Sequence, residues 1–221
     1  MSEWIDLTAS DGHRVSAYVA RPARPAGVVV IAQEVFGVNR HIQDVADGYA
    51  RDGFLAIAPS FFDRIERGIA LGYERPDVER GLSLTKQLNS VQTVMDAQAA
   101  IDFARQTGKV GMVGYCWGGT TSWICAAQTN GLAASVCYYG GGIIANGALV
   151  PRCPVMIYWA ELDTIIPIDK ARDFIASHPA VEHHIYPADH GFNCNLRGSY
   201  HEPSATLAKT RTLAFLRRHL G

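Results

Sequence analysis

The sequence predicts an α/β protein in which a mainly parallel sheet is flanked by helices on both faces. Short, continuous apolar runs alternate with longer amphipathic segments, a pattern typical of buried parallel strands joined by helices. The chain has 221 residues, of which 48% are hydrophobic and 19% charged. This is enough for one sizeable core, so we expect a single domain over residues 1–221.

In the first half of the chain, apolar runs and turn residues define four strands and one helix. The run Ala26–Glu34 is continuously apolar up to its last two residues, as expected for a strand buried on both faces. A helix is expected at His41–Asp52 because Gly53 stops it, and the stretch from Ser60 to Pro76 is expected to be a loop. The expected strands are Trp4–Thr8, His13–Ala20, Ala26–Glu34 and Phe54–Pro59.

The second half continues the alternation. Asp77 is expected to cap a helix, and Ser90–Arg105 is expected to form another before Gly108. The strand Lys109–Val113 then leads into a glycine-rich turn and a further helix. The remaining elements are strands Ala133–Tyr138, Pro154–Trp159 and Glu182–Tyr186, and helices Ile168–Ser177 and Pro203–His219. Sites in such sheets lie beyond the carboxyl ends of the strands, so those ends are where we look for function.

Composition excludes several classes of protein. The net charge is -1 and basic residues do not cluster, which argues against nucleic acid or acidic membrane partners. Apolar runs such as Ala26–Ala32 are too short to span a bilayer, and the N-terminus lacks the features of a signal peptide. The five cysteines have no CxxC spacing, which argues against disulfides and zinc. We expect a monomeric cytoplasmic enzyme without a metal or cofactor.

The turn after Lys109–Val113 carries the most specific motif. "GYCWGG" fits the pattern G-x-C-x-G, the strand-to-helix elbow that usually presents a catalytic serine. We predict that Cys116 is a nucleophile, because the start of a helix favours a thiolate; the alternative is a buried, unreactive thiol. The other cysteines are expected to pack rather than react, and five histidines to be solvated or to lie at helix ends. These residues are Cys125, Cys137, Cys153 and Cys194, and His13, His41, His178, His201 and His219.

Reactive groups follow four of the predicted strands: Glu34, Cys116, Asp163 and His190. The order nucleophile, acid, histidine is that of the α/β-hydrolase triad. His190 would take the thiol proton and later protonate the leaving group, while Asp163 would hold the imidazole in the required tautomer. Taken singly, Asp163 could be a turn residue and His190 a loop cap.

The same segments predict an oxyanion hole and a pocket lining. The backbone amide of Trp117, directly after the nucleophile, and that of Val35, after the first buried strand, are the expected donors. Phe36 and Tyr139 are expected to contact substrate in an apolar cleft, with ordinary core packing as the alternative.

Together, "GYCWGG", "AELDTIIP", "YPADHGFN" and "VVVIAQEVFGVN" resemble the dienelactone hydrolases, also called carboxymethylenebutenolidases. The resemblance covers nearly the whole chain and implies a minimal α/β-hydrolase fold without a large cap domain. It also implies that Cys116, His190 and Asp163 hydrolyse a dienelactone to maleylacetate through a thioester. Glu34 matches the family's glutamate that helps to activate the thiol, the alternative being a structural ion pair with an arginine.

The chain departs from the family where a substrate carboxylate would be held. Dienelactone-specific members carry an arginine four residues after the triad histidine, and here that residue is Cys194. Arg197 and, on the helix after the loop, Arg80 (less well Arg75) are the candidate substitutes, since arginine forms paired bonds to carboxylates. Surface solvation is the alternative for both.

We therefore expect a small, anionic ester or lactone as substrate. A broad-specificity carboxylesterase or thioesterase using the same triad is the main alternative. A peptidase is less favoured, and a non-catalytic ligand-binding domain is the alternative from a different functional class.

Overall fold

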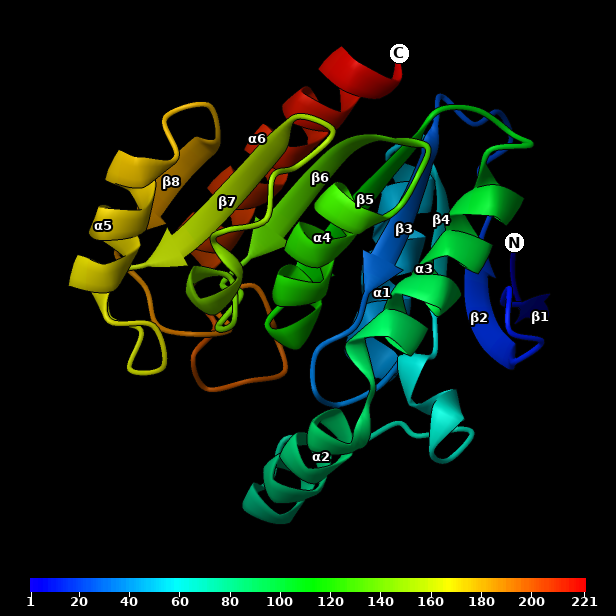
Figure 1. Ribbon diagram of the computed structural model, residues 1–221, viewed down its shortest axis with the longest axis horizontal. Coiled ribbons are helices and arrows are strands. Elements are labelled where there is room, and N and C mark those ends of the chain that lie inside the picture. The colour runs from blue at the N-terminus through cyan, green and yellow to red at the C-terminus, as the bar shows by residue number, and fades with distance from the viewer.

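One sheet of eight strands runs through the computed structural model, which describes residues 1–221 (Figure 1). The spatial order is β1-β2-β4-β3-β5-β6-β7-β8. β2 pairs antiparallel with β1 and β4, and all other pairs are parallel, which confirms the predicted sheet. The strands are β1 Ser2–Thr8, β2 Arg14–Ala20, β3 Val28–Ala32, β4 Leu55–Pro59, β5 Val110–Tyr115, β6 Leu132–Tyr138, β7 Val155–Ala160 and β8 Glu182–Tyr186.

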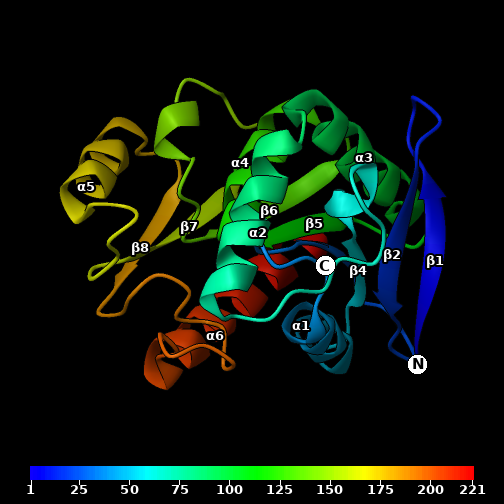
Figure 2. The ribbon, with the colours of Figure 1, turned by 90° about the horizontal axis from the view of Figure 1, so that it is seen from below.

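Helices cover both faces of this sheet, as predicted for an α/β-hydrolase fold. α1 and α6 pack on one face and α3, α4 and α5 on the other (Figure 2). α2 lies apart from both layers, beyond the carboxyl ends of the strands, and no cap domain covers the sheet (Figure 1). The helices are α1 Arg40–Arg51, α2 Arg75–Gln87, α3 Ser90–Ala104, α4 Trp117–Gln128, α5 Ile168–Ser177 and α6 Glu202–Leu220. None is long and apolar enough to cross a membrane.

The packing explains why the central strands are continuously apolar. Successive side chains of a strand point to opposite faces of the sheet. In β3, Val29 and Ile31 pack in the cluster that contains α1 and α6, whereas Val28 and Val30 pack in the cluster that contains α3. Since both faces are covered, every position of the strand is buried.

The predicted element bounds differ from the structure in several places. β3 ends at Ala32 rather than Glu34, because its pairing with β5 stops at Ala32, so Glu34 lies in the loop beyond the sheet. Asp77 is not a helix cap: α2 begins at Arg75, and Pro76 fits its first turn because no backbone donor is needed there. The expected loop after Ser60 contains a 3₁₀ turn at Phe61–Arg64.

The turn between β5 and α4 lies very close to the end of β3. A Cβ atom added at Gly118 would be 2.2 Å from the carbonyl oxygen of Ala32, and one added at Gly114 would be 1.8 Å from the carbonyl oxygen of Gly118. Neither distance is compatible with a side chain, so glycine is required for α4 to start against β3.

We predict that Gly118→Ala destabilises the protein by about 2 kcal/mol or more, since overpacking a rigid backbone contact is costly. Gly108→Ala is the matched control, because a Cβ there would come no closer than 3.9 Å to its nearest neighbour. Urea unfolding of both variants measures the difference. Equal stability of the two variants would contradict the requirement for glycine at the elbow.

Candidate active site

The register of β3 and β5 brings two reactive side chains to neighbouring strand ends. Ala32 is the partner of Gly114, and Glu34 and Cys116 each follow two residues later. The strand order reverses between β3 and β5, since β4 lies on one side of β3 and β5 on the other. Binding sites of open α/β sheets lie at such reversals, beyond the carboxyl ends of the strands.

Cys116 occupies a strained backbone conformation at the elbow. Its φ of 55° and ψ of -118° are rare for a residue with a side chain. The conformation is held by local bonds, in which its N–H donates to Tyr138 at 3.0 Å and its carbonyl accepts from Gly119 at 2.9 Å. The thiol consequently stands at the N-terminus of α4, where the helix dipole favours a thiolate.

Asp163, His190 and Cys116 form one hydrogen-bonded chain. His190 Nδ1 lies 2.7 Å from Asp163 Oδ2, and Nε2 lies 3.2 Å from Cys116 Sγ. The other oxygen of Asp163 accepts from the N–H groups of Ile165 and Ile166 at 2.8 and 3.0 Å, which holds the carboxylate in place. Asp163 and His190 are both buried. The three residues that the sequence placed after β5, β7 and β8 are thus in contact.

The environment of His190 favours its charged form. Burial by itself lowers the pKa of the imidazole, but the hydrogen bonds to Asp163 and Cys116 outweigh burial and raise the pKa to about 10. A protonated imidazole donates from both nitrogens. Near neutral pH the site is therefore suited to an imidazolium that donates to the carboxylate on one side and to sulfur on the other.

Two backbone N–H groups beside Cys116 have no partner in the chain. Val35 lies outside the sheet and its N–H donates to no acceptor. Trp117 is the first residue of α4, where an N–H has no carbonyl one turn earlier. These are the two donors that the sequence analysis assigned to an oxyanion hole.

α2 packs directly against the Val35 peptide, a contact that the sequence analysis missed. A Cβ added at Gly81 would lie 2.2 Å from the Val35 carbonyl oxygen. A further hydrogen bond joins the loop after β3 to the segment before α2: the Asn39 side chain donates to the Leu71 carbonyl at 2.9 Å. A glycine inside a helical segment was the available signal, because it often marks close backbone packing.

Glu34 is buried next to an arginine from another loop. Arg197 Nη1 lies 3.7 Å from Glu34 Oε1, and the guanidinium stands 5.6 Å from the ring centre of Phe36. Arg80 and Arg75 lie elsewhere, on exposed positions of α2, where each is 2.9 Å from a glutamate. Of the three candidate arginines, Arg197 is the one placed beside Glu34.

The two candidate aromatic residues are both buried near these groups. Tyr139 has a φ of 37°, its hydroxyl has no hydrogen-bond partner, and its ring centre is 5.1 Å from that of His190. Phe36 packs edge-to-face with Tyr73 at 4.7 Å. Tyr139 therefore borders the triad, and Phe36 lies between Tyr73 and Arg197.

His41 is an unexpected neighbour of Glu34. It was expected to be solvated or to lie at a helix end, and it does lie in the first turn of α1, but its side chain is buried. Together with Cys194, which packs as expected, it lies close to Glu34. No sequence spacing indicated this cluster, because its three members come from separate segments.

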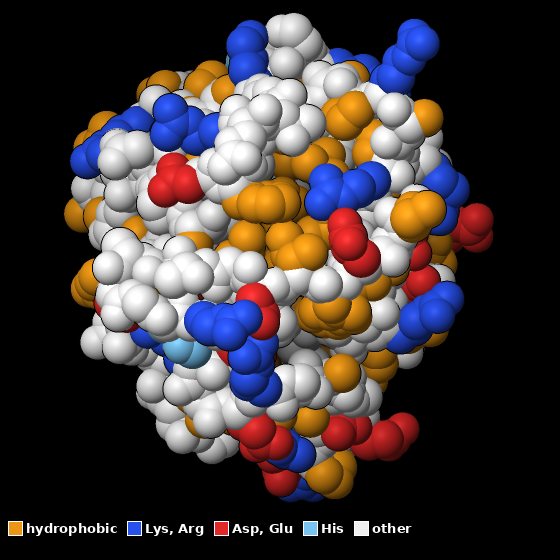
Figure 3. All heavy atoms as spheres, turned by 90° about the vertical axis from the view of Figure 1, so that its right-hand side faces the viewer, with side chains coloured by type: hydrophobic (Ala, Val, Ile, Leu, Met, Phe, Trp, Pro, Cys, Tyr) orange, Lys and Arg blue, Asp and Glu red, His pale blue; other side chains and the backbone are white.

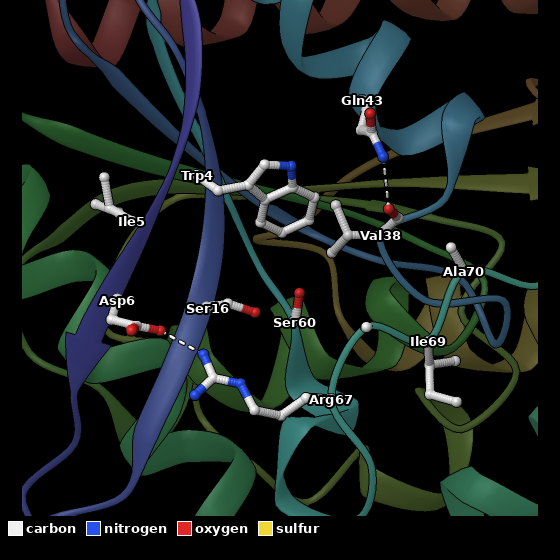
Figure 4. A pocket seen from close by; sticks show the side chains of 11 residues that line it. Trp4, Ile5, Asp6, Ser16, Val38, Gln43, Ser60, Arg67, Ile69 and Ala70 are labelled. Carbon is white, nitrogen blue, oxygen red and sulfur yellow. Dashed lines mark hydrogen bonds and ion pairs between the residues drawn. The ribbon is translucent and has the colours of Figure 1, made fainter.

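A groove of about 550 Å³ lies away from the triad, between the β1–β2 edge and the segment before α2 (Figure 4). Hydrophobic side chains gather on this face of the molecule, with charged side chains around them (Figure 3). None of the four reactive residues, Glu34, Cys116, Asp163 and His190, lines the groove. Its one basic group, Arg67, is already paired with Asp6. The triad region is therefore the better candidate for chemistry.

The comparisons with known proteins agree with the geometry. The sequence matches the dienelactone hydrolase family over residues 15–220. It is 32% identical to the carboxymethylenebutenolidase of Pseudomonas putida, with 98% of this chain and 96% of that protein covered. Carboxymethylenebutenolidase 1 of Cupriavidus pinatubonensis is 31% identical, with coverages of 98% and 97%. The crystal structure of a provisionally named dienelactone hydrolase from Klebsiella pneumoniae has a TM-score of 0.79 and 28% identity, over 97% of this chain and 98% of that one.

We predict that iodoacetamide alkylates Cys116 first at neutral pH. Burial raises the pKa of Cys125 to about 12, raises that of Cys137 as well, and raises those of Cys153 and Cys194 to about 11, so these four thiols stay protonated. Cys116 alone has an imidazole within hydrogen-bond distance. Mass spectrometry of peptides after timed alkylation gives the five rates.

The His190→Gln variant is the control for that measurement. It should slow alkylation of Cys116 and leave the other four rates unchanged. Equal, slow rates for all five cysteines in the unaltered protein would contradict an activated Cys116 and favour a binding role.

Proposed function

Because the chain belongs to the dienelactone hydrolase family, we propose that it hydrolyses a small lactone or carboxylic ester with Cys116 as nucleophile. The observation that carries the proposal is the hydrogen-bonded chain from Asp163 through His190 to Cys116. A nucleophile within hydrogen-bond distance of a base, with the base held by a carboxylate, is the arrangement that acyl transfer requires.

In the first step the thiolate of Cys116 attacks the carbonyl carbon of the substrate. The new S–C bond forms as the carbonyl electron pair moves onto oxygen, giving a tetrahedral oxyanion. The N–H groups of Val35 and Trp117 stabilise that negative charge, because they are oriented before the reaction begins and have no other partner. The proton that the thiol has lost resides on His190.

In the second step the tetrahedral intermediate collapses. The bond from carbon to the leaving oxygen breaks, His190 donates its proton to that oxygen, and a thioester on Cys116 results. Water then attacks the thioester while neutral His190 takes one of its protons. Breaking the S–C bond releases the carboxylic acid and restores the thiolate and imidazolium, so each turnover consumes one water molecule.

Two charged residues near the triad have proposed roles, Arg197 in binding the substrate and Glu34 in activating the thiol. Arg197 would bind a carboxylate of the substrate. It would thereby replace the arginine that dienelactone-specific members carry at the position of Cys194. In molecules whose Cys116 is still protonated when substrate binds, the buried Glu34 would accept the thiol proton in place of His190. The substrate we propose is a dienelactone with a free carboxylate, which opens to a maleylacetate-type acid.

A broad carboxylesterase or thioesterase is the second candidate. The observation that favours it is the replacement of the family's arginine by Cys194, a buried thiol that lacks the positive charge and the paired donors of arginine. Arg197 would then neutralise Glu34 and hold no substrate group. The chemistry at Cys116 is the same in both cases, and only the substrate differs.

The test of this function is hydrolysis kinetics on a dienelactone and on a p-nitrophenyl ester. We predict that Cys116→Ala lowers kcat on both by at least about a thousandfold, as expected when a triad nucleophile is removed. Cys153→Ala, which alters a cysteine outside the site, should retain full activity. Activity of Cys116→Ala near that of the unaltered protein would rule out the mechanism, and cleavage of the simple ester alone would favour the second candidate.

We also predict that Arg197→Gln raises KM for the dienelactone by at least about tenfold, the cost of losing one charged hydrogen bond. Its kinetics on the neutral p-nitrophenyl ester should stay the same, because that substrate has no carboxylate. Arg80→Gln is the matched control and should leave both substrates unaffected. An unchanged KM for the dienelactone in Arg197→Gln would show that this arginine does not bind the carboxylate.

A further inference from the structure

Three potential metal ligands meet in the interior beside the triad. Glu34 follows β3, His41 belongs to the first turn of α1, and Cys194 lies in the loop after β8. One donor atom from each lies within 4.8 Å of those of the other two. Their side chains belong to residues that are only 1%, 3% and 0% exposed. A carboxylate, an imidazole and a thiol are thus held together away from solvent.

Three polar atoms of this cluster lack a hydrogen-bond partner within the chain. Both carboxylate oxygens of Glu34 and Nε2 of His41 are buried and accept or donate no hydrogen bond. The Arg197 guanidinium lies 3.7 Å from Oε1 of Glu34, which is an ion pair but not a hydrogen bond. Buried polar groups in folded proteins nearly always have a partner, so these unpaired atoms indicate a ligand.

We propose that Glu34, His41 and Cys194 bind one Zn²⁺ or similar divalent transition-metal ion. Oxygen, nitrogen and sulfur donors are the set that zinc accepts, and three protein ligands leave a fourth position for water. The thiol of Cys194 loses its proton to solvent as its sulfur binds. One thiolate and one carboxylate then balance the two positive charges of the metal, which leaves the positive charge of Arg197 beside the site without a partner.

The geometry requires only a small contraction. Zinc lies about 2.0–2.3 Å from its ligand atoms, which places those atoms roughly 3.3–3.8 Å apart in a tetrahedral site. The separations of up to 4.8 Å therefore close by about 1 Å through side-chain rotation. His41 also lines an open groove of about 480 Å³ with Tyr115 and Asn195, so rotation of this imidazole connects the cluster to solvent.

A metal at this position inhibits the hydrolase. Glu34 bound to a cation cannot accept a proton from Cys116, and Arg197 next to the metal is repelled from its place beside the carboxylate. This inhibitory effect depends on the proposed role of Glu34. Binding of the metal depends only on the three ligands, so the two can be tested separately.

The experiment is calorimetric titration of the purified full-length protein with ZnCl₂, together with absorption spectra after addition of Co²⁺. We expect one Zn²⁺ per chain and a thiolate-to-cobalt charge-transfer band. Cys194→Ser and His41→Gln should each weaken Zn²⁺ binding at least about tenfold, and Cys194→Ser should lose the band. Circular dichroism establishes that both variants are folded.

Three control variants locate the metal. Cys153→Ser and His219→Gln remove the same residue types elsewhere and should bind Zn²⁺ as the unaltered protein does. Cys116→Ala should also retain the affinity and the cobalt band. Absence of Zn²⁺ binding, or binding that is lost in Cys116→Ala and kept in Cys194→Ser, would overturn the proposal, the latter by placing the metal on the triad.

Inhibition has its own readout. Zn²⁺ should suppress hydrolysis of the p-nitrophenyl ester by the unaltered protein at the concentrations at which it binds, and Cys194→Ser should be resistant. Stoichiometric binding at the three ligands without loss of activity would disprove the inhibitory effect and leave the metal site intact.

Discussion

The backbone contact between the start of α4 and the end of β3 is the constraint on which the rest of the site depends. It is possible only because Gly118 lacks a side chain, since a Cβ there would lie 2.2 Å from the Ala32 carbonyl oxygen. The contact brings the elbow against the loop after β3. As a result Cys116 and Trp117 pack against the cluster that contains Val35, so the elbow and the loop after β3 adjoin in the fold.

Burial then determines how the charged groups behave. His190 is enclosed, which disfavours its charge, yet its bonds of 2.7 Å to Asp163 and 3.2 Å to Cys116 reverse that effect and raise its pKa. The other cysteines have no such partner, so burial keeps them protonated. The same fold thus contains one thiol paired with an imidazole that a carboxylate holds, and four thiols without that pairing.

The departure from the family pattern at Cys194 changes the surroundings of Glu34. Where an arginine is expected, the chain places a small buried thiol, and the positive charge near Glu34 comes from Arg197 in the same loop. A thiol and the imidazole of His41 then face a carboxylate whose oxygens have no hydrogen-bond partner. The region that the family uses to orient an anionic substrate therefore also acquires the donor atoms of a metal site in this chain.

The sequence by itself determined the order of strands and helices and the position of the elbow, because both depend on local patterns. A strand that is apolar at every position, such as β3, indicates a sheet covered on both faces. The motif G-x-C-x-G between a strand and a helix indicates a sharp turn, because its glycines allow a close backbone approach that larger residues would block. Only the tertiary structure decided which arginine stands beside Glu34 and that His41 and Cys194 meet it. Those contacts join the loop after β3, the first turn of α1 and the loop after β8, and their geometry depends on side-chain packing that no local pattern encodes.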